Sequence, residues 1–340
     1  MTAGRLDPWV AELADGLAAA LREIVRPHLG LTAARGLAGT AVGGDTTFAI
    51  DETAENEIGR FLDEWGAPVA VYSEDKGLRT WGEEPRYVLI VDPIDGTRPA
   101  AAGFEAACVS IAVARWSERP TMADVVYAVV QEIKEGGVFR GRRGDGVEIF
   151  DGAGSARPLR LSPNTDLSRL FWTIGFRGRP AAELVAVLGE LIDRSWVDGA
   201  VFDIGSATYS MTRVLTGQLD AYVDVGPRML EVAPWVERRF RAVGNGGVLN
   251  NAPYDVAATT MLLEEAGCAV TDALGRSLGA RPLLGSDVAF QMAVVASANV
   301  GVQQALLAVI GAGMERLASL PVPVAGVGRG GTGDGAGDGR

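Results

Sequence analysis

The chain opens with two segments in which apolar residues recur every three or four positions. Residues 9–25 and residues 52–65 both carry this spacing, which places apolar side chains along one face of a helix. Acidic residues gather in the first turn of the second segment, where the helix dipole favours them. We therefore predict two helices, joined by a Gly-rich stretch over 37–51 that is typical of a mobile loop with short extended pieces.

Short apolar runs that are rich in β-branched and aromatic residues come next. Runs of this length, bounded by Gly, Pro, Asp or Asn, are typical of buried strands. A Gly-Asp-Gly sequence between two of these runs predicts a hairpin. In this half of the chain the predicted strands cover residues 67–73, 86–92, 107–116, 123–133 and the two arms of 136–150.

The second half alternates between the two kinds of pattern, which is typical of a layered α/β protein. We predict strands over 169–176, 219–226, 268–275 and 289–299, and helices over 181–195, 206–218, 253–267 and 302–317. The expected organisation is an N-terminal α+β half over 1–155, a C-terminal α/β half over 156–322 and a disordered Gly-rich tail over 323–340.

Composition then narrows the functional classes. Of 340 residues, 31 are basic and 43 acidic, and the net charge of −12 repels nucleic acid polymers and anionic membranes. No uncharged apolar run is long enough to span a membrane, and the N-terminus lacks the apolar core of a signal peptide. A single histidine, His28, leaves little material for a Ser-His-Asp relay or a His-rich metal site. Two cysteines do not make a disulfide scaffold, so we expect a cytoplasmic protein.

Carboxylates follow the ends of two predicted strands. One strand runs into Asp-Pro-Ile-Asp-Gly-Thr, and the strand before it ends at Glu74 and Asp75. Asp92 and Asp95 lie three residues apart, so they converge only if the chain turns, and the proline between them favours a turn. Strand ends in α/β proteins commonly form ligand sites. Asp255, near the start of a predicted helix, is a third candidate, although an aspartate there also serves as a helix N-cap.

Carboxylates without a neighbouring histidine or thiolate favour hard cations. Oxygen ligands select Mg²⁺, Mn²⁺ or Ca²⁺ over Zn²⁺. Two carboxylates about 4 Å apart repel each other by about 4 kcal/mol at an effective dielectric constant of about 20. A bound divalent cation removes that cost, and without one some of the carboxyl groups must be protonated.

The order of the motifs resembles the inositol monophosphatase family, which shares a superfamily with fructose 1,6-bisphosphatase and the lithium-sensitive bisphosphate phosphatases. The matching motifs are G-D-x-x-T/F-x-I-D, S-E-D, D-P-I-D-G-T, G-S-A, G-x-L-D-A-Y and Y-D-V-A-A. They extend from about residue 40 to residue 300. The resemblance implies a layered α-β-α-β-α sandwich that hydrolyses a phosphate monoester of a small polyol, sugar or nucleotide with two or three Mg²⁺ ions, for which Mn²⁺ could substitute.

The resemblance also implies roles for individual residues. The implied metal ligands are Glu74, Asp92, the carbonyl of Ile94, Asp95 and Asp255. The implied catalytic residues, which act on the attacking water, are Asp45 and Thr97 together with Glu74. The implied substrate contacts are Gly96 and Thr97 for the phosphate, and Gly205, Ser206, Ala207 and Asp224 for the part of the substrate that bears hydroxyl groups.

The chain departs from the family pattern beside the implied catalytic turn. Residues 98–100 read Arg-Pro-Ala where the family commonly continues x-Asn-Phe, Tyr254 replaces a usual tryptophan, and the segment 225–252 is longer. Because arginine suits phosphate and carboxylate recognition, Arg98 and Arg177 are candidates for binding a second anionic group of the substrate.

Two other classes stay open at this point. One is a non-catalytic metal- or phosphate-binding regulator on the same fold, which would be expected to have lost a ligand or the threonine. The other is an unrelated Ca²⁺-stabilised structural protein. The basic cluster at 237–241 faces either the substrate or the solvent. From the family resemblance alone we also expect a homodimer and lithium sensitivity.

Overall fold

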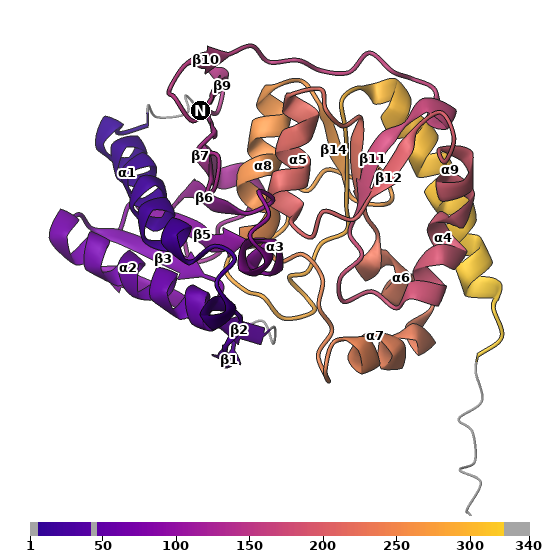
Figure 1. Cartoon of the computed structure of the whole chain (residues 1–340), viewed down its shortest axis with the longest axis horizontal. Helices are drawn as coiled ribbons and strands as arrows, with labels where there is room; N and C mark the ends of the chain where they lie inside the picture. Colours follow the sequence, from indigo (N-terminus) through magenta and orange to yellow (C-terminus); the bar gives the residue numbers. More distant parts are fainter. Residues whose placement is uncertain (1–5, 42–45, 323–340) are drawn as a thin grey trace, which may run out of the picture.

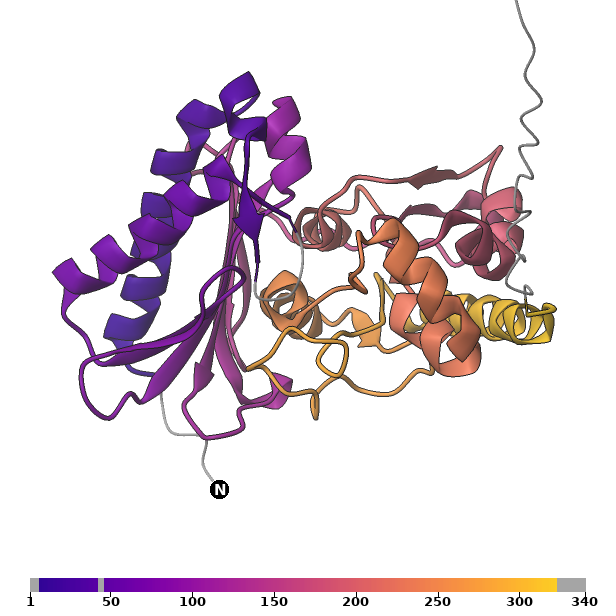
Figure 2. The ribbon, with the colours of Figure 1, turned by 90° about the horizontal axis from the view of Figure 1, so that it is seen from below.

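Helix and sheet layers alternate through the computed structural model, which describes residues 6–41 and 46–322 (Figures 1 and 2). Asp45 and the predicted tail at 323–340 lie outside these residues. The first layer holds α1 (Pro8–Val25) and α2 (Ala49–Trp65), so both predicted N-terminal helices are confirmed. In the Gly-rich stretch between them, β1 (Leu37–Thr40) pairs with β2 (Thr46–Phe48).

The first layer covers one face of the larger sheet. Its strand order is β10-β9-β8-β7-β6-β5-β3-β4 in the described part of the chain. The strands are β3 (Val69–Ser73), β4 (Gly77–Trp81), β5 (Tyr87–Asp95), β6 (Cys108–Arg115), β7 (Val125–Glu132), β8 (Val138–Arg142), β9 (Gly146–Phe150) and β10 (Ala156–Arg157). The edge strands β4 and β10 were not predicted from the sequence, because neither contains a continuous apolar run. The predicted hairpin of β8 and β9 is confirmed.

The opposite face of this sheet packs against α5 (Ala207–Leu215) and α8 (Pro253–Glu265). These helices come from the second half of the sequence, and their buried side chains share one hydrophobic cluster with β3, β5, β6 and β7. The middle layer therefore joins the two halves through a common core. The division at residue 155 stays a prediction, and β10, just beyond it, still pairs with β9.

The smaller sheet lies beyond α5 and α8, with strand order β12-β11-β13-β15-β14. Its strands are β11 (Phe171–Ile174), β12 (Ala200–Phe202), β13 (Ala221–Asp224), β14 (Ala269–Thr271) and β15 (Val294–Ser297). The last layer holds α4 (Ala181–Arg194), α6 (Gly226–Val232) and α9 (Val300–Ser319), while α7 (Glu237–Val243) lies beside them. A separate hydrophobic cluster fills the space between this sheet and α4, α6 and α9.

Short elements complete the chain. They are α3 (Thr97–Ala102) and the 3₁₀ turns Arg26–His28, Thr32–Arg35, Met122–Asp124, Leu167–Arg169 and Pro234–Val236. The layer order is α-β-α-β-α, as expected from the sequence. Among the described residues, no helix is both long and apolar enough to cross a membrane.

Candidate metal and phosphate site

A bulge in β5 brings Asp92 and Asp95 together. In a regular strand, residues three apart point to opposite faces of the sheet. Asp92 is opposite Ser110 of β6 and Asp95 is opposite Cys108, so β5 holds one extra residue between the two aspartates. An extra residue of this kind re-aims the side chains that follow it. From the sequence we expected a turn to bring Asp92 and Asp95 together. In the structure a bulge at the end of the strand does so.

Three carboxylates meet beyond this bulge. One carboxylate oxygen from each of Asp92, Asp95 and Asp255 lies within 4.8 Å of the others. Glu74, from the turn between β3 and β4, lines the same pocket. Burial, with the charges of Glu74, Asp95 and Asp255, raises the pKa of Asp92 well above its usual value. Burial and the charge of Asp95 raise the pKa of Asp255 to about 8.

The middle helices position two of these carboxylates. Asp95 accepts hydrogen bonds from the backbone N–H of Thr208 and from Ser206 Oγ, the latter at 2.9 Å. Asp255 lies in the first turn of α8, where its Oδ2 accepts a hydrogen bond from the backbone N–H of Ala252 at 2.6 Å. The N-cap role considered for Asp255 is wrong, because Ala252 is the N-cap and Asp255 is the third residue of the helix. The hydrogen bond from Ala252 still fixes the Asp255 carboxylate at the start of α8.

The chain turns sharply after Asp95. Gly96 adopts a φ of 94°, and a Cβ atom there would collide with the carbonyl oxygen of Ala106, so only glycine fits. Thr97 is the first residue of α3, and its Oγ1 donates a hydrogen bond to the carbonyl of Ile94 at 3.1 Å. Gly96, Thr97 and Ile94 all line the pocket of the carboxylates, so the structure brings the implied phosphate and water contacts next to the implied ligands.

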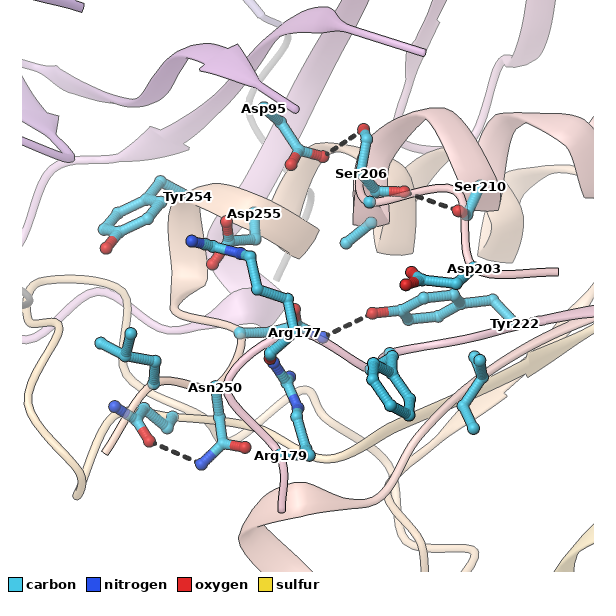
Figure 3. A pocket seen from close by; sticks show the side chains of 18 of the residues that line it. Asp95, Arg177, Arg179, Asp203, Ser206, Ser210, Tyr222, Asn250, Tyr254 and Asp255 are labelled. Carbon is cyan, nitrogen blue, oxygen red and sulfur yellow. Dashed lines mark hydrogen bonds between the residues drawn. The ribbon is translucent and has the colours of Figure 1, made fainter. Parts of the chain in front are cut away.

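Two arginines border the acidic pocket. Arg98 and Arg177 both line it, and the guanidinium of Arg98 lies 5.4 Å from the centre of the Phe48 ring. Figure 3 shows the Arg177 side chain reaching across the cleft toward Asp255. The positive charge of Arg177 partly offsets the elevated pKa of both Asp95 and Asp255. The cations proposed from sequence to recognise anions thus lie where a phosphate would approach the carboxylates.

A buried glutamate supports the turn that carries Glu74. Glu55 of α2 has a fully buried side chain, yet it ion-pairs with Arg79 of β4 at 2.9 Å. Its second oxygen accepts a hydrogen bond from the backbone N–H of Asp75 at 3.3 Å. This arrangement ties the middle of the β3–β4 turn and strand β4 to α2, next to Glu74. Sequence reasoning did not select Glu55, because only the fold places it behind the turn.

A larger cleft opens from the acidic pocket, with an empty volume of about 720 Å³ that includes its mouth. Glu74, Asp95 and Asp255 form one end of it. Of the implied hydroxyl contacts, Gly205, Ser206 and Ala207 line the cleft and Asp224 does not. Polar cleft residues that sequence reasoning missed include Arg179, Asp203, Tyr222, Asn250 and Gln291. These residues share no sequence signal. Tyr222 and Gln291 lie inside predicted strands, Arg179 follows one, and Asp203 and Asn250 precede predicted helices.

The aromatic departure from the family pattern also lies in this cleft. Tyr254 is buried, lines the cleft and stacks on Tyr72 with ring centres 6.5 Å apart. Tyr72 in turn donates a hydrogen bond from its hydroxyl group to Ser286 Oγ at 3.3 Å. The ring at position 254 therefore forms a rigid wall next to Asp255.

The long segment before α8 contributes to the cleft through its end, not through its basic cluster. Leu249, Asn250 and Asn251 line the cleft. In α7, Arg239 pairs with Glu183 and Arg241 pairs with Glu237, and neither arginine lines the cleft. The structure thus supports the solvent-facing interpretation of those two arginines.

Comparison with known proteins agrees with this geometry. The model of the inositol monophosphatase family matches residues 9–312. A fructose-1,6-bisphosphatase/inositol-1-monophosphatase from Methanothermobacter thermautotrophicus is 26% identical over 265 residues, which are 76% of this chain and 82% of that protein. A bifunctional NADP phosphatase/NAD kinase from Methanocaldococcus jannaschii is 25% identical over 62% of this chain, but the match spans only 39% of that protein.

Solved structures support the fold independently. An inositol monophosphatase from Thermotoga maritima superposes with a TM-score of 0.64 at 19% identity, over 92% of this chain and all of the other. An inositol monophosphatase from Anabaena gives a TM-score of 0.61 at 21% identity, over 89% of this chain and 96% of the other. With a family model that matches most of its length, the chain belongs to the inositol monophosphatase family and, with it, to the phosphoric monoester hydrolases.

Proposed function

We propose that this phosphatase depends on Mg²⁺ and hydrolyses a phosphate monoester of a small polyol, sugar or nucleotide. The observation that carries the proposal is the convergence of Asp92, Asp95 and Asp255 within 4.8 Å, with Glu74 in the same pocket. Four acidic groups around one pocket, two of them buried, are costly unless positive charge joins them. All are hard oxygen donors, which fit Mg²⁺ or Mn²⁺. Two or three ions remain the expected number.

The residues around the pocket have distinct proposed tasks. Asp92, Asp95, Asp255, Glu74 and the carbonyl of Ile94 would hold the ions. Bound divalent cations would supply the positive charge that attracts a phosphate dianion to this acidic protein and would lower the pKa of the attacking water. The Thr97 hydroxyl would orient that water. Asp45, its proposed partner, lies outside the described residues, so its role stays a prediction.

The substrate contacts follow from the shape of the turn. The backbone of Gly96 and Thr97 begins α3, and N–H groups at the start of a helix favour a phosphate. Arg98 and Arg177 border the same pocket and would bind either the scissile phosphate or a second anionic group. The relatives that act on fructose 1,6-bisphosphate or NADP support the second alternative, and the name inositol monophosphatase supports the first. Dimerisation, lithium sensitivity and a cytoplasmic location also remain predictions.

Phosphate release from a panel of metabolites tests the proposal. The panel holds inositol 1-phosphate, fructose 1,6-bisphosphate, 3′-phosphoadenosine 5′-phosphate, sugar 1-phosphates and nucleoside monophosphates, each assayed with Mg²⁺ and with a chelator. We expect release from at least one compound, lost on chelation and restored by Mg²⁺ or Mn²⁺. Comparison of wild type with Arg98→Ala on mono- and bisphosphates then shows whether Arg98 reads a second anion. Bound Mg²⁺ without any turnover would instead favour the non-catalytic regulator.

Mg²⁺ should stabilise the protein more at pH 8 than at pH 6. Burial raises the pKa of Asp92, Asp95 and Asp255 above their unfolded values, for Asp255 to about 8. The unfolded chain releases these protons above about pH 4, whereas the folded protein retains them. The stability of the metal-free protein therefore falls between about pH 4 and pH 8. Mg²⁺ competes with the protons, so its increment in Tm should grow with pH.

Thermal unfolding with and without Mg²⁺ at several pH values measures this effect. Asp92→Asn, in the same buffers, serves as the control in which the increment should shrink. An Mg²⁺ increment that is constant from pH 6 to pH 8 would contradict the assignment of these carboxylates as ligands.

A further inference from the structure

Asp224, the carboxylate implied to contact substrate hydroxyls, already has partners for both oxygens. Its side chain is fully buried and forms an ion pair with the nearly buried Arg179. Oδ1 accepts hydrogen bonds from Arg179 Nε at 3.3 Å and from the backbone N–H of Gly226 at 3.1 Å. Oδ2 accepts from Arg179 and, at 3.5 Å, from the hydroxyl of Tyr222. An aspartate has few acceptor positions beyond these, so Asp224 is poorly placed to bind a substrate.

Asp203 lies on the cleft wall instead. It lines the cleft, and Figure 3 shows its carboxylate turned toward the space beside the Tyr222 ring. The other aspartates that line the cleft, Asp95 and Asp255, belong to the acidic cluster. Among the described residues that line the cleft, Asp203 is thus the aspartate left outside that cluster.

The loop that carries Asp203 is fixed to the catalytic turn. Gly205 packs so closely against Pro99 of α3 that a Cβ atom at 205 would lie 3.2 Å from the proline ring. The next residue, Ser206, donates its hydrogen bond to Asp95 and caps α5 by accepting one from the backbone N–H of Tyr209 at 3.0 Å. Asp203 is therefore held at a set position relative to the carboxylates, as a residue that selects the leaving group must be.

The charges around Asp203 suit hydroxyl recognition. Partial burial raises the pKa of Asp203. A hydrogen bond from the backbone N–H of Gly205 and the positive charges of Arg179 and Arg177, which line the same cleft, limit that rise. An ionised carboxylate accepts hydrogen bonds and donates none, so it attracts hydroxyl groups and repels an anionic group placed directly against it. A leaving group with neighbouring hydroxyls can donate further hydrogen bonds to this carboxylate, and one without hydroxyls offers it no donor.

We propose that Asp203, and not Asp224, determines specificity by accepting hydrogen bonds from hydroxyl groups of the leaving alcohol. This inference rests on the proposed phosphatase function. The favoured substrate class is a phosphate monoester whose alcohol carries free hydroxyls close to the ester, as in a polyol or a sugar.

Paired substrates test the proposal without knowledge of the natural one. Inositol 1-phosphate and glycerol 2-phosphate carry hydroxyls near the ester, whereas phenyl phosphate carries none. We expect Asp203→Ala to lower kcat/KM for the polyol esters roughly 10- to 100-fold, the range for a lost hydrogen bond to a charged group. The value for phenyl phosphate should change by less than about threefold. Asp203→Asn, which keeps one acceptor oxygen, should recover part of the loss.

Two matched variants complete the experiment. Asp198→Ala removes an exposed aspartate from the same segment that does not line the cleft, and it should change neither substrate class. Asp224→Asn should lower Tm without changing the ratio between the classes. An equal loss on phenyl phosphate and the polyol esters in Asp203→Ala, or selectivity lost only in Asp224→Asn, would overturn the inference. If wild type hydrolyses none of these esters with Mg²⁺, the proposed function fails and not merely the role of Asp203.

Discussion

Asp92→Asn is expected to lower kcat/KM for phosphate release by roughly a thousandfold or more, the scale on which loss of a central catalytic group acts. The substitution keeps the shape of the side chain, and the amide oxygen can still accept the hydrogen bond that Asp92 receives from the backbone N–H of Ile94 at 2.9 Å. What it removes is one negative charge beside Glu74, Asp95 and Asp255. Mg²⁺ affinity, measured by calorimetry, should fall together with activity.

The Tm of the same variant shows whether activity falls because a metal ligand is lost or because the fold is destabilised. Asp92 is 1% exposed, and its burial among like charges raises its pKa. Removal of that charge should leave the Tm of the metal-free protein unchanged or higher. Asp193→Asn, at an exposed position of α4, is the control for a general charge effect. Activity in Asp92→Asn close to that of wild type would refute the assignment of Asp92 as an essential ligand.

Arg179→Ala is expected to produce the largest loss of stability, about 3–5 kcal/mol, which is typical when one partner of a buried ion pair is removed. The side chains of Arg179 and Asp224 are 6% and 0% exposed. Without the guanidinium, Asp224 keeps the Gly226 N–H and the Tyr222 hydroxyl as partners, which do not balance a buried negative charge. Chemical denaturation with a linear extrapolation to water measures the loss.

A double variant shows whether the uncompensated charge is the cause. Arg179→Ala combined with Asp224→Asn removes both charges, so it should recover a large part of the stability lost in Arg179→Ala alone. Arg276→Ala, which breaks an exposed pair with Asp272, should cost far less stability than Arg179→Ala, because exposed ion pairs are screened by solvent. Equal stability of Arg179→Ala and the double variant would mean that lost packing, and not the charge of Asp224, explains the effect.

The sequence predicted the convergence of the carboxylates better than the surroundings of Ser206 and Asp224, for a physical reason. Asp92 and Asp95 lie in one short motif, so a single bulge decides whether they converge, and the bulge observed in β5 brings them together. Ser206 and Asp224 were expected to contact the substrate. The motifs around these two residues do not show which side chains lie next to them in the fold. Ser206 donates to Asp95, and Asp224 pairs with Arg179, 45 residues earlier in the chain.

By itself the sequence predicted the long helices, most buried strands and a group of carboxylates, and the family resemblance implied the layer order. Apolar spacing defined the long helices and the buried strands because each buries one face or both, and motif order identified the family. Tertiary structure alone decided which polar groups neutralise one another. It placed Glu55 behind the Glu74 turn, Arg179 on Asp224, and Asp203 on the wall of the cleft. Such pairings join segments that are distant in the sequence. No local periodicity predicts them, because the partner of a charged side chain depends on which groups the fold brings near it.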